Sequence, residues 1–132
     1  GPAGQVGPGA GRDRFVIVAI GTDLARIARW EKHTDGLLRR SFTPAEIESC
    51  AGRAASLAGR WAAKESVLKA LGVGIGDVPL TDIEIVRVGD GPPVVALHGT
   101  AASLAAQAGL TEWHVSISHE GDYAIAFVVA TG

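Results

Sequence analysis

The chain has 132 residues, of which 47% are apolar and 20% are charged, and its net charge is −2. This composition is typical of one folded domain, and it excludes a largely disordered chain. The slightly negative charge gives no broad basic surface for nucleic acid, and no apolar run approaches the roughly 18 residues that a membrane span requires. We therefore expect neither a nucleic-acid partner nor a membrane segment.

The first residues, 1–13, are rich in glycine and contain two prolines. Such a segment buries little apolar surface, so it predicts a disordered linker or a cloning remnant. The sequence contains no methionine, which favours a start that is not a native translation start. We expect the folded domain to cover residues 14–132.

An apolar, β-branched run at residues 15–20 predicts a strand that is buried on both faces. Gly21, Thr22 and Asp23 end this run, and a helix is predicted over residues 24–32. Asp23 is compatible with two roles at this junction, a helix cap or a metal ligand.

The segment from Thr43 to Glu46 has the pattern of a capping box with Pro44 at the first helical position. It predicts a helix that continues to about Cys50. Because Cys50 is the only cysteine, no disulfide can form within the chain. A buried thiol in a cytoplasmic protein is the expected reading.

A long helix is predicted over residues 53–71, with charged side chains among apolar ones. The apolar stripe of this helix consists of Leu57, Trp61, Leu68 and Leu71. A strip along its edge consists of Ala58, Ala62, Glu65 and Lys69. Glu65 and Lys69 are spaced as a helix-stabilising pair, which is also compatible with a solvated face. Lys64 falls within the apolar stripe, where its charge requires an anion or a carboxylate.

Glycines at 72, 74 and 76 end this helix and expose backbone N–H groups, so Gly72 and Gly74 are candidates for close approach to a ligand. Strands are then predicted at 82–88 and 93–97, a helix at 100–108, and strands at 113–118 and 123–130. This order predicts an α+β domain, with helices on one face of a mainly antiparallel sheet.

Two carboxylates on separate elements, Asp23 and Glu65, are suited to hold one Mg²⁺ with phosphate oxygens as its other ligands. Arg60, Lys64, Lys69 and His114 are then candidates to bind those phosphates. Each residue also has a structural alternative, and for His114 this is the polar face of an ordinary strand.

Six segments occur in the order typical of holo-acyl-carrier-protein synthases: residues 20–24 (IGTDL), 42–46 (FTPAE), 57–65 (LAGRWAAKE), 72–76 (GVGIG), 82–85 (DIEI) and 114–119 (HVSISH). The chain resembles this small type of 4′-phosphopantetheinyl transferase over residues 15–130. Two stretches are also similar to the transferase domain of type I fatty acid synthases. The resemblance implies the 4′-phosphopantetheinyl transferase fold, in which a long helix packs on a mainly antiparallel sheet.

The resemblance implies transfer of the pantetheine-phosphate arm of coenzyme A to a serine of an apo acyl carrier protein, with release of adenosine 3′,5′-bisphosphate. Asp23 and Glu65 are then the Mg²⁺ ligands, and Lys69 steadies the pyrophosphate. Arg60 and His114 match positions that contact the 3′-phosphate, and Lys64 is a further candidate of undefined role. The base is either Glu65 or a metal-bound water held by Asp23.

Similar enzymes are homotrimers with active sites between subunits, and an arginine matching Arg29 meets acidic residues of the carrier. Arg26 is a second docking candidate, although a solvated position suits it better. Val73 and Trp61 depart from the residues usual in the family. Two other function classes stay open, a non-catalytic degenerate transferase and an unrelated Mg²⁺-dependent phosphohydrolase. The sequence does not identify the carrier, from fatty acid or polyketide synthesis, nor whether the domain is free-standing.

Overall fold

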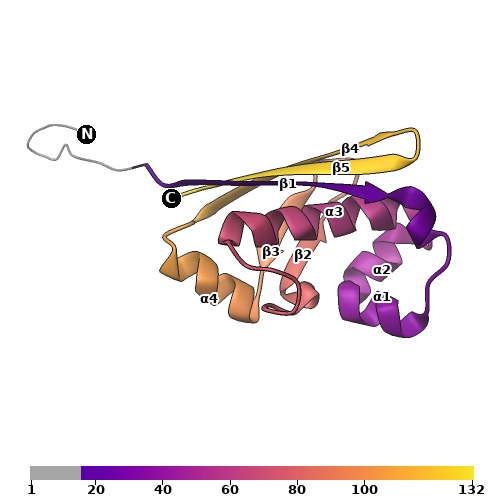
Figure 1. Cartoon of the computed structure of the whole chain (residues 1–132), viewed down its shortest axis with the longest axis horizontal. Coiled ribbons are helices and arrows are strands. Elements are labelled where there is room, and N and C mark those ends of the chain that lie inside the picture. The colour runs from indigo at the N-terminus through magenta and orange to yellow at the C-terminus, as the bar shows by residue number, and fades with distance from the viewer. Residues whose placement is uncertain (1–15) are drawn as a thin grey trace, which may run out of the picture.

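The computed structural model describes residues 16–132, so the predicted linker at 1–13 lies outside the described residues (Figure 1). Two 3₁₀ helices accompany the helices and strands. In chain order the elements are β1 (Val18–Arg26), η1 (Ile27–Trp30), α1 (Asp35–Ser41), α2 (Pro44–Cys50), α3 (Ala54–Leu71), η2 (Leu80–Asp82), β2 (Ile83–Val86), β3 (Val94–Leu97), α4 (Gly99–Gln107), β4 (Glu112–Glu120) and β5 (Tyr123–Thr131). No helix among these is both long and apolar enough to cross a membrane.

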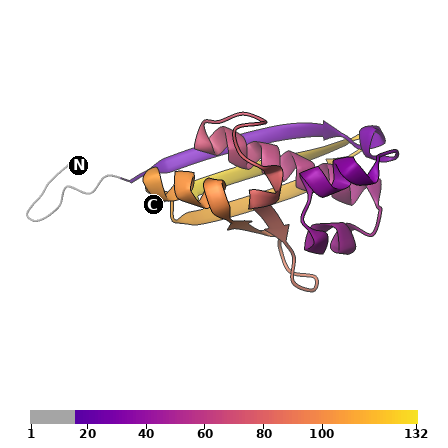
Figure 2. The ribbon, with the colours of Figure 1, turned by 90° about the horizontal axis from the view of Figure 1, so that it is seen from below.

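The main sheet is antiparallel, with strand order β1-β5-β4, and α3 lies along one of its faces (Figure 1). The β2–β3 hairpin, α1, α2 and α4 lie on the far side of α3, as the view from below shows (Figure 2). The other face of the main sheet is uncovered. The predicted α+β architecture, with a long helix packed on a mainly antiparallel sheet, is confirmed.

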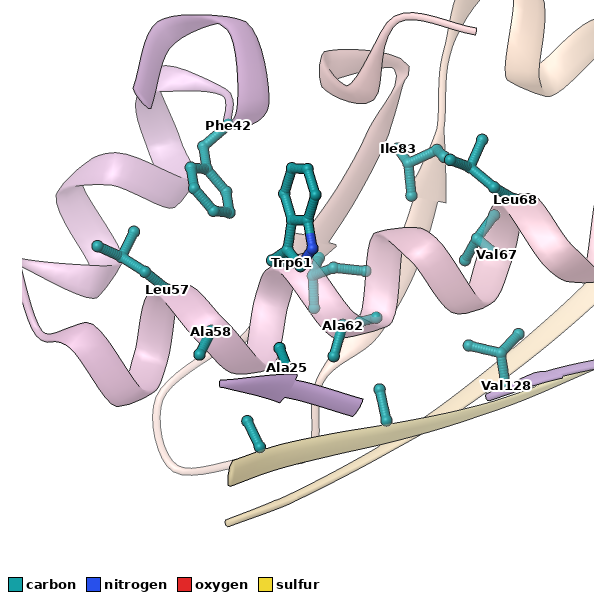
Figure 3. Packing of buried hydrophobic residues seen from close by; sticks show 14 of the residues in the cluster. Ala25, Phe42, Leu57, Ala58, Trp61, Ala62, Val67, Leu68, Ile83 and Val128 are labelled. Carbon is teal, nitrogen blue, oxygen red and sulfur yellow. The ribbon is translucent and has the colours of Figure 1, made fainter. Parts of the chain in front are cut away.

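Small residues allow α3 to approach the sheet closely. An added Cβ at Gly21 of β1 would lie 1.8 Å from the carbonyl oxygen of Ser66, so no larger residue fits there without moving the helix. Ala58 and Ala62 of α3 face Ala25 and Val128 of the sheet in the same layer (Figure 3). The strands thereby hold α3 with little freedom to shift.

The opposite side of α3 carries the predicted apolar stripe. Leu57, Trp61 and Leu68 are buried there and point toward Phe42 and the β2 residue Ile83 (Figure 3). Because both sides of α3 are covered, the helix is the centre of the core rather than a surface element. The capping box of α2 is also present, with Thr43 and Glu46 bonded reciprocally and Pro44 in the first turn.

The prediction of a helix over residues 24–32 is wrong. β1 continues to Arg26 and pairs with β5 up to the Arg26–Tyr123 position, and only a 3₁₀ turn follows. The local residues Leu24, Ala25 and Arg26 favour a helix, but hydrogen bonds to a strand a hundred residues later determine their conformation. Helix α1 was not predicted at all; Thr34 caps it by accepting a hydrogen bond from Leu37 N at 3.0 Å.

The prediction that the first strand is buried on both faces is also wrong. The strand alternates, and its apolar side chains Val18, Ile20 and Leu24 are about 60% exposed on the uncovered face of the sheet. From β5, Ile125 and Phe127 are exposed on this face as well. We call these five residues the open apolar face. Cys50, in contrast, is fully buried as predicted, and burial raises the pKa of its thiol.

Candidate functional site

Two carboxylates meet where β1 passes the C-terminal half of α3. Asp23 lies within β1 and contacts Lys69 of α3, and Glu65 lies one turn before Lys69 on the same helix. Burial raises the pKa of Glu65 above its ordinary value, and the charge of Asp23 raises it further, while Lys69 and Arg29 oppose the shift. The two acidic side chains predicted to converge are therefore neighbours.

Lys69 fixes the position of Asp23. Its Nζ donates to the Thr22 carbonyl at 2.8 Å and to Asp23 Oδ1 at 3.3 Å. The Lys69 side chain is 54% exposed, so its ammonium group remains accessible to an external anion. The Lys69 ammonium group thus lies at the margin of the carboxylate pair, as the helical spacing predicts.

One oxygen of this pair has no partner in the fold. Glu65 Oε2 is buried and accepts no hydrogen bond from the described residues. A buried carboxylate oxygen without a donor is unfavourable, and a second carboxylate beside it increases the cost. Both features are relieved if a cation binds between Asp23 and Glu65.

The donor set fits Mg²⁺ better than a softer metal. Residues 16–132 contain no cluster of three or more histidine, cysteine, aspartate or glutamate side chains suited to a metal. Mg²⁺ is commonly bound by one or two carboxylates, with waters and substrate phosphates completing its shell. The pair Asp23 and Glu65 meets this requirement, and a fully protein-ligated zinc or iron centre does not.

A basic cleft of about 140 Å³ lies along the N-terminal part of α3, near the turn between β4 and β5. Its lining combines cationic and hydroxyl side chains with a glycine and one apolar residue: Ser49, Arg53, Ser56, Gly59, Arg60, Arg87, Ile117 and His119. A side chain at Gly59 would meet Ile117 at 2.9 Å, so the glycine lets β4 approach the helix. No acidic residue lines this cleft.

The arginines of the basic cleft bond only to neutral groups. Arg60 donates to Ser49 Oγ at 2.9 Å, Arg53 to Ser49 O at 2.9 Å, and Arg87 to Gly91 O at 3.1 Å. Arg60 Nε is buried without any partner, and within the described chain none of the three forms a salt bridge. Uncompensated guanidinium groups that converge on one cleft are typical of a phosphate site.

Lys64 does not belong to this set, which corrects its prediction as a ligand for phosphate. Its side chain is fully buried, and Nζ bonds to Glu46 Oε1 at 2.7 Å, to Leu80 O at 2.9 Å and to Ile83 O. Burial lowers the pKa of Lys64, and the Glu46 charge opposes that shift. All three N–H donors are used, so Lys64 joins α2, α3 and β2 instead of binding a ligand.

The structure does not bring His114 and Arg60 together within one chain. His114 is exposed on the uncovered face of β4, whereas Arg60 lies on α3 at the opposite face. His119 lies in the basic cleft instead, with Nε2 at 2.9 Å from the Ala55 carbonyl. The signal was present in the sequence, since two histidines five residues apart in a strand point to opposite faces.

The remaining candidates lie around these two sites. Gly72 ends α3 in a left-handed conformation, and the Gly74 N–H donates to Asp77 Oδ2 at 2.8 Å, so this amide is already used. The Arg29 guanidinium lies over the Trp61 ring at 5.2 Å. Arg26 lies over the Tyr123 ring, also at 5.2 Å, at the end of the main sheet.

Comparisons with known proteins identify the family. Residues 19–128 match the 4′-phosphopantetheinyl transferase superfamily. The chain is 48% identical to the holo-[acyl-carrier-protein] synthase of Desulforudis audaxviator, over 89% of this chain and 95% of that protein. It is 44% identical to the fatty acid synthase subunit alpha of Saccharomyces cerevisiae, over 85% of this chain and 6% of that subunit.

A solved structure is similar in the same way. The holo-[acyl-carrier-protein] synthase of Helicobacter pylori in complex with coenzyme A aligns with a TM-score of 0.75 at 35% identity, over 84% of this chain and 98% of that one. The family match over residues 19–128 includes most of the main sheet, all of α3 and the β2–β3 hairpin. The chain therefore belongs to the 4′-phosphopantetheinyl transferase superfamily, among the enzymes of the holo-[acyl-carrier-protein] synthase type.

Proposed function

We propose that this chain transfers the 4′-phosphopantetheine group of coenzyme A to a serine of an apo acyl carrier protein, in a reaction that depends on Mg²⁺. The observation that carries the proposal is the pair Asp23 and Glu65, with the buried Glu65 Oε2 left without a partner beside Lys69. Relatives that are 44–48% identical include a holo-[acyl-carrier-protein] synthase and a fatty acid synthase subunit, which supports this substrate class.

Coenzyme A carries phosphate at two places, a pyrophosphate and a 3′-phosphate. We place the pyrophosphate at the carboxylate pair, where Asp23 and Glu65 would hold Mg²⁺ and Lys69 supplies a further positive charge. The 3′-phosphate is placed in the basic cleft, where Arg60 and His119 face the same space. Arg53 and Arg87 are additional cations there, and guanidinium groups suit phosphate oxygens.

In the proposed reaction the carrier's serine oxygen attacks the pantetheine-side phosphorus of the pyrophosphate. The new bond joins that phosphorus to the serine, and the bond to the bridging oxygen breaks, so adenosine 3′,5′-bisphosphate leaves with the electron pair. Bound Mg²⁺ supplies Lewis-acid stabilisation of the phosphate charge. The serine proton goes either to Glu65 or to a metal-bound water that Asp23 would hold.

We also propose that the open apolar face packs against other copies of the chain in a homotrimer. Its three β1 side chains, Val18, Ile20 and Leu24, are about 60% exposed. The two β5 side chains, Ile125 and Phe127, are 45% and 47% exposed. A contiguous exposed apolar surface of this kind is typical of a protein interface. His114 lies on this same face, where it is available to a neighbouring subunit. A cytoplasmic location remains a prediction from the sequence.

The direct test is mass spectrometry of an apo acyl carrier protein incubated with the enzyme, coenzyme A and Mg²⁺. The proposal predicts a mass increase of one phosphopantetheine group and stoichiometric adenosine 3′,5′-bisphosphate. A phosphohydrolase would release nucleotide or phosphate with the carrier unmodified, and a degenerate transferase would change neither substrate. Either result would contradict the proposed function.

A further inference from the structure

Arg29 is an exposed residue whose charged group is nevertheless held against the protein. Its Cζ lies 5.2 Å from the centroid of the Trp61 ring and 5.8 Å from that of Trp30 (the two rings are called the indole shelf below). Trp61 is 9% exposed and Trp30 is 1% exposed, and their rings lie 5.4 Å apart at 49°. The shelf is therefore part of the core and offers a fixed surface to the guanidinium.

The indole shelf is itself supported from behind. Phe42 packs edge-on against Trp30 with ring centroids 5.4 Å apart. Figure 3 shows Phe42 and Trp61 on the same side of α3, away from the sheet. Phe42 thus contributes to the packing of this region without lying beneath Arg29.

A cation within about 6 Å of an aromatic centroid is attracted to the ring face, and tryptophan attracts it most strongly. Arg29 has no carboxylate within salt-bridge distance among the described residues. Its side chain is therefore restrained by rings, while its charge is left for an external anion. A restrained arginine loses less conformational freedom when a partner binds, which favours binding.

The shelf also fixes where this charge lies relative to the candidate active site. Trp61 precedes Glu65 by one turn of α3, so the two side chains leave the helix on neighbouring positions of one face. Arg29 is therefore held at the border of the carboxylate pair. A macromolecule that presents its serine to that pair therefore comes close to this charge.

We propose that Trp61 is a positioning residue, which holds the Arg29 guanidinium ready to receive an acidic group of the carrier protein. This inference rests on the proposed function, since it concerns docking of the carrier protein, for which the family resemblance makes Arg29 the candidate. The occupant is an acidic carrier surface rather than coenzyme A, because the phosphates of coenzyme A have the separate basic cleft.

The test is a graded series at position 61, measured with a bacterial apo acyl carrier protein as the probe substrate. Trp61→Leu removes the ring and should raise the carrier KM about two- to fivefold, whereas Trp61→Phe should give a smaller rise. In an Arg29→Gln background the same changes should have no further effect on KM. Phe42→Leu is the matched control, because it removes a core ring that does not lie under Arg29.

A spectroscopic readout keeps the test independent of stability. Ring currents should shift the Arg29 side-chain resonances upfield in the NMR spectrum of the wild type, less in Trp61→Phe, and least in Trp61→Leu, where only the Trp30 ring remains near Arg29. Trp61→Phe retains a buried ring, so its partial shift is measurable even if Trp61→Leu folds poorly. Calorimetric binding of coenzyme A serves as the reference, and its dissociation constant should stay near the wild-type value throughout the series.

The outcomes separate the two ideas. If Arg29→Gln leaves the carrier KM at its wild-type value, the docking role is wrong, and this inference fails with it. If Arg29→Gln raises KM but Trp61→Leu changes neither KM nor the Arg29 resonances, only the positioning role is wrong. If Phe42→Leu raises KM as much as Trp61→Leu, general loss of packing explains the effect, which likewise contradicts the inference.

Discussion

Two glutamates, Glu46 on α2 and Glu65 on α3, differ in whether the fold supplies hydrogen-bond donors to their carboxylate oxygens. Glu46 is 1% exposed, and each of its oxygens has a partner: Oε1 accepts from Thr43 N and Lys64 Nζ, and Oε2 accepts from Ile85 N. Glu65 has a buried oxygen without a donor and a second carboxylate next to it. The first arrangement is complete within the chain, whereas the second leaves a buried oxygen without a partner among the described residues, which is why we propose a cation there.

The same contrast separates the cations of α3. Lys64 is enclosed by three acceptors, while Arg60, about one turn earlier, has one neutral side-chain acceptor and an unpartnered Nε. A charged group whose hydrogen bonds are satisfied inside the chain contributes to stability. One that is buried without a partner is a candidate ligand site, and this distinction predicts different consequences for mutations along one helix.

The largest effect is expected at the unsatisfied carboxylates. Glu65→Gln should lower kcat/KM at least about 1,000-fold, since loss of a charged metal ligand removes several kcal/mol of transition-state stabilisation. The free energy of unfolding should stay the same or rise, because repulsion with Asp23 is removed. Steady-state kinetics and urea denaturation of the same preparation measure both quantities.

Asp23→Asn is the matched variant, and it should lower kcat/KM as strongly as Glu65→Gln without loss of stability. Glu46→Gln provides the contrast, since it should reduce stability much more than the catalytic rate. If Glu65→Gln unfolds as readily as Glu46→Gln, the two glutamates do not differ in the way proposed.

The next effect concerns stability. Lys64→Met should destabilise the fold by about 3–5 kcal/mol, because it leaves the Glu46 charge buried and unpaired. Lys69→Met, at an exposed ion pair, should change the free energy of unfolding by less than about 1 kcal/mol. Chemical denaturation in the absence of substrates compares the two lysines directly.

Removing both charges of the buried pair tests the mechanism of that loss. Glu46→Leu combined with Lys64→Met should recover much of the stability lost in Lys64→Met alone. Additive losses in the double variant would mean that the pair is not the reason for the effect.

A smaller effect should distinguish the residues of the basic cleft from His114. Arg60→Ala and His119→Ala should each lower the binding affinity for coenzyme A about 10- to 100-fold, as expected for lost hydrogen bonds to a charged group. Both variants should lower the affinity for 3′-dephospho-coenzyme A much less. Competition kinetics with the two compounds measures the ratio of their affinities in each variant.

His114→Ala is the comparison variant, because within one chain its side chain lies on the other face of the sheet and would reach the 3′-phosphate only from a neighbouring subunit. The same discrimination in His114→Ala as in Arg60→Ala would place the 3′-phosphate elsewhere than in the basic cleft of one chain.

The smallest expected change is at the edge of the Glu46 network. The Thr43 hydroxyl accepts from Glu46 N and donates to Glu84 Oε2 at 2.7 Å, so Thr43→Val should cost about 1–2 kcal/mol. Thr43 and then His98 hold the pKa of Glu84 below its ordinary value. That part of the stability is complete above the unfolded pKa of about 4.3 and is lost as pH falls through the lower folded value.

The pH dependence supplies the check for Thr43. Denaturation curves of wild type and Thr43→Val should differ most above about pH 5 and approach one another below about pH 4. A constant difference across this range would show that Glu84 ionisation does not contribute. Serine at position 43 is the conservative control and should retain both hydrogen bonds.

Elements with strong local signals were predictable from the sequence. Thr43, Pro44 and Glu46 specify the start of α2, and Gly72 specifies the end of α3, because caps depend on residues only a few positions apart. The path of residues 24–26 was not predictable in this way. Their conformation depends on pairing with residues 123–125, which no local pattern encodes.

The same limit applies to the candidate sites. Alternation in β4 shows that His114 and His119 face opposite sides, but only the placement of α3 decides which side holds the basic cleft. Lys64 clearly required an anion, yet its partner Glu46 lies 18 residues away on a different helix. Asp23 and Glu65 lie on separate elements, so no spacing along the chain defines how close they come, and their role as a metal site stays a prediction.

The central claim is that Asp23 and Glu65 together bind a divalent cation, and calorimetry tests it without turnover. Mg²⁺ would be titrated into the wild-type enzyme saturated with coenzyme A, and into Asp23→Asn, Glu65→Gln and Lys69→Met under the same conditions. We expect one Mg²⁺ site per chain in the wild type and in Lys69→Met, and its loss in both carboxylate variants. Equal Mg²⁺ affinity in wild type and Glu65→Gln would contradict it.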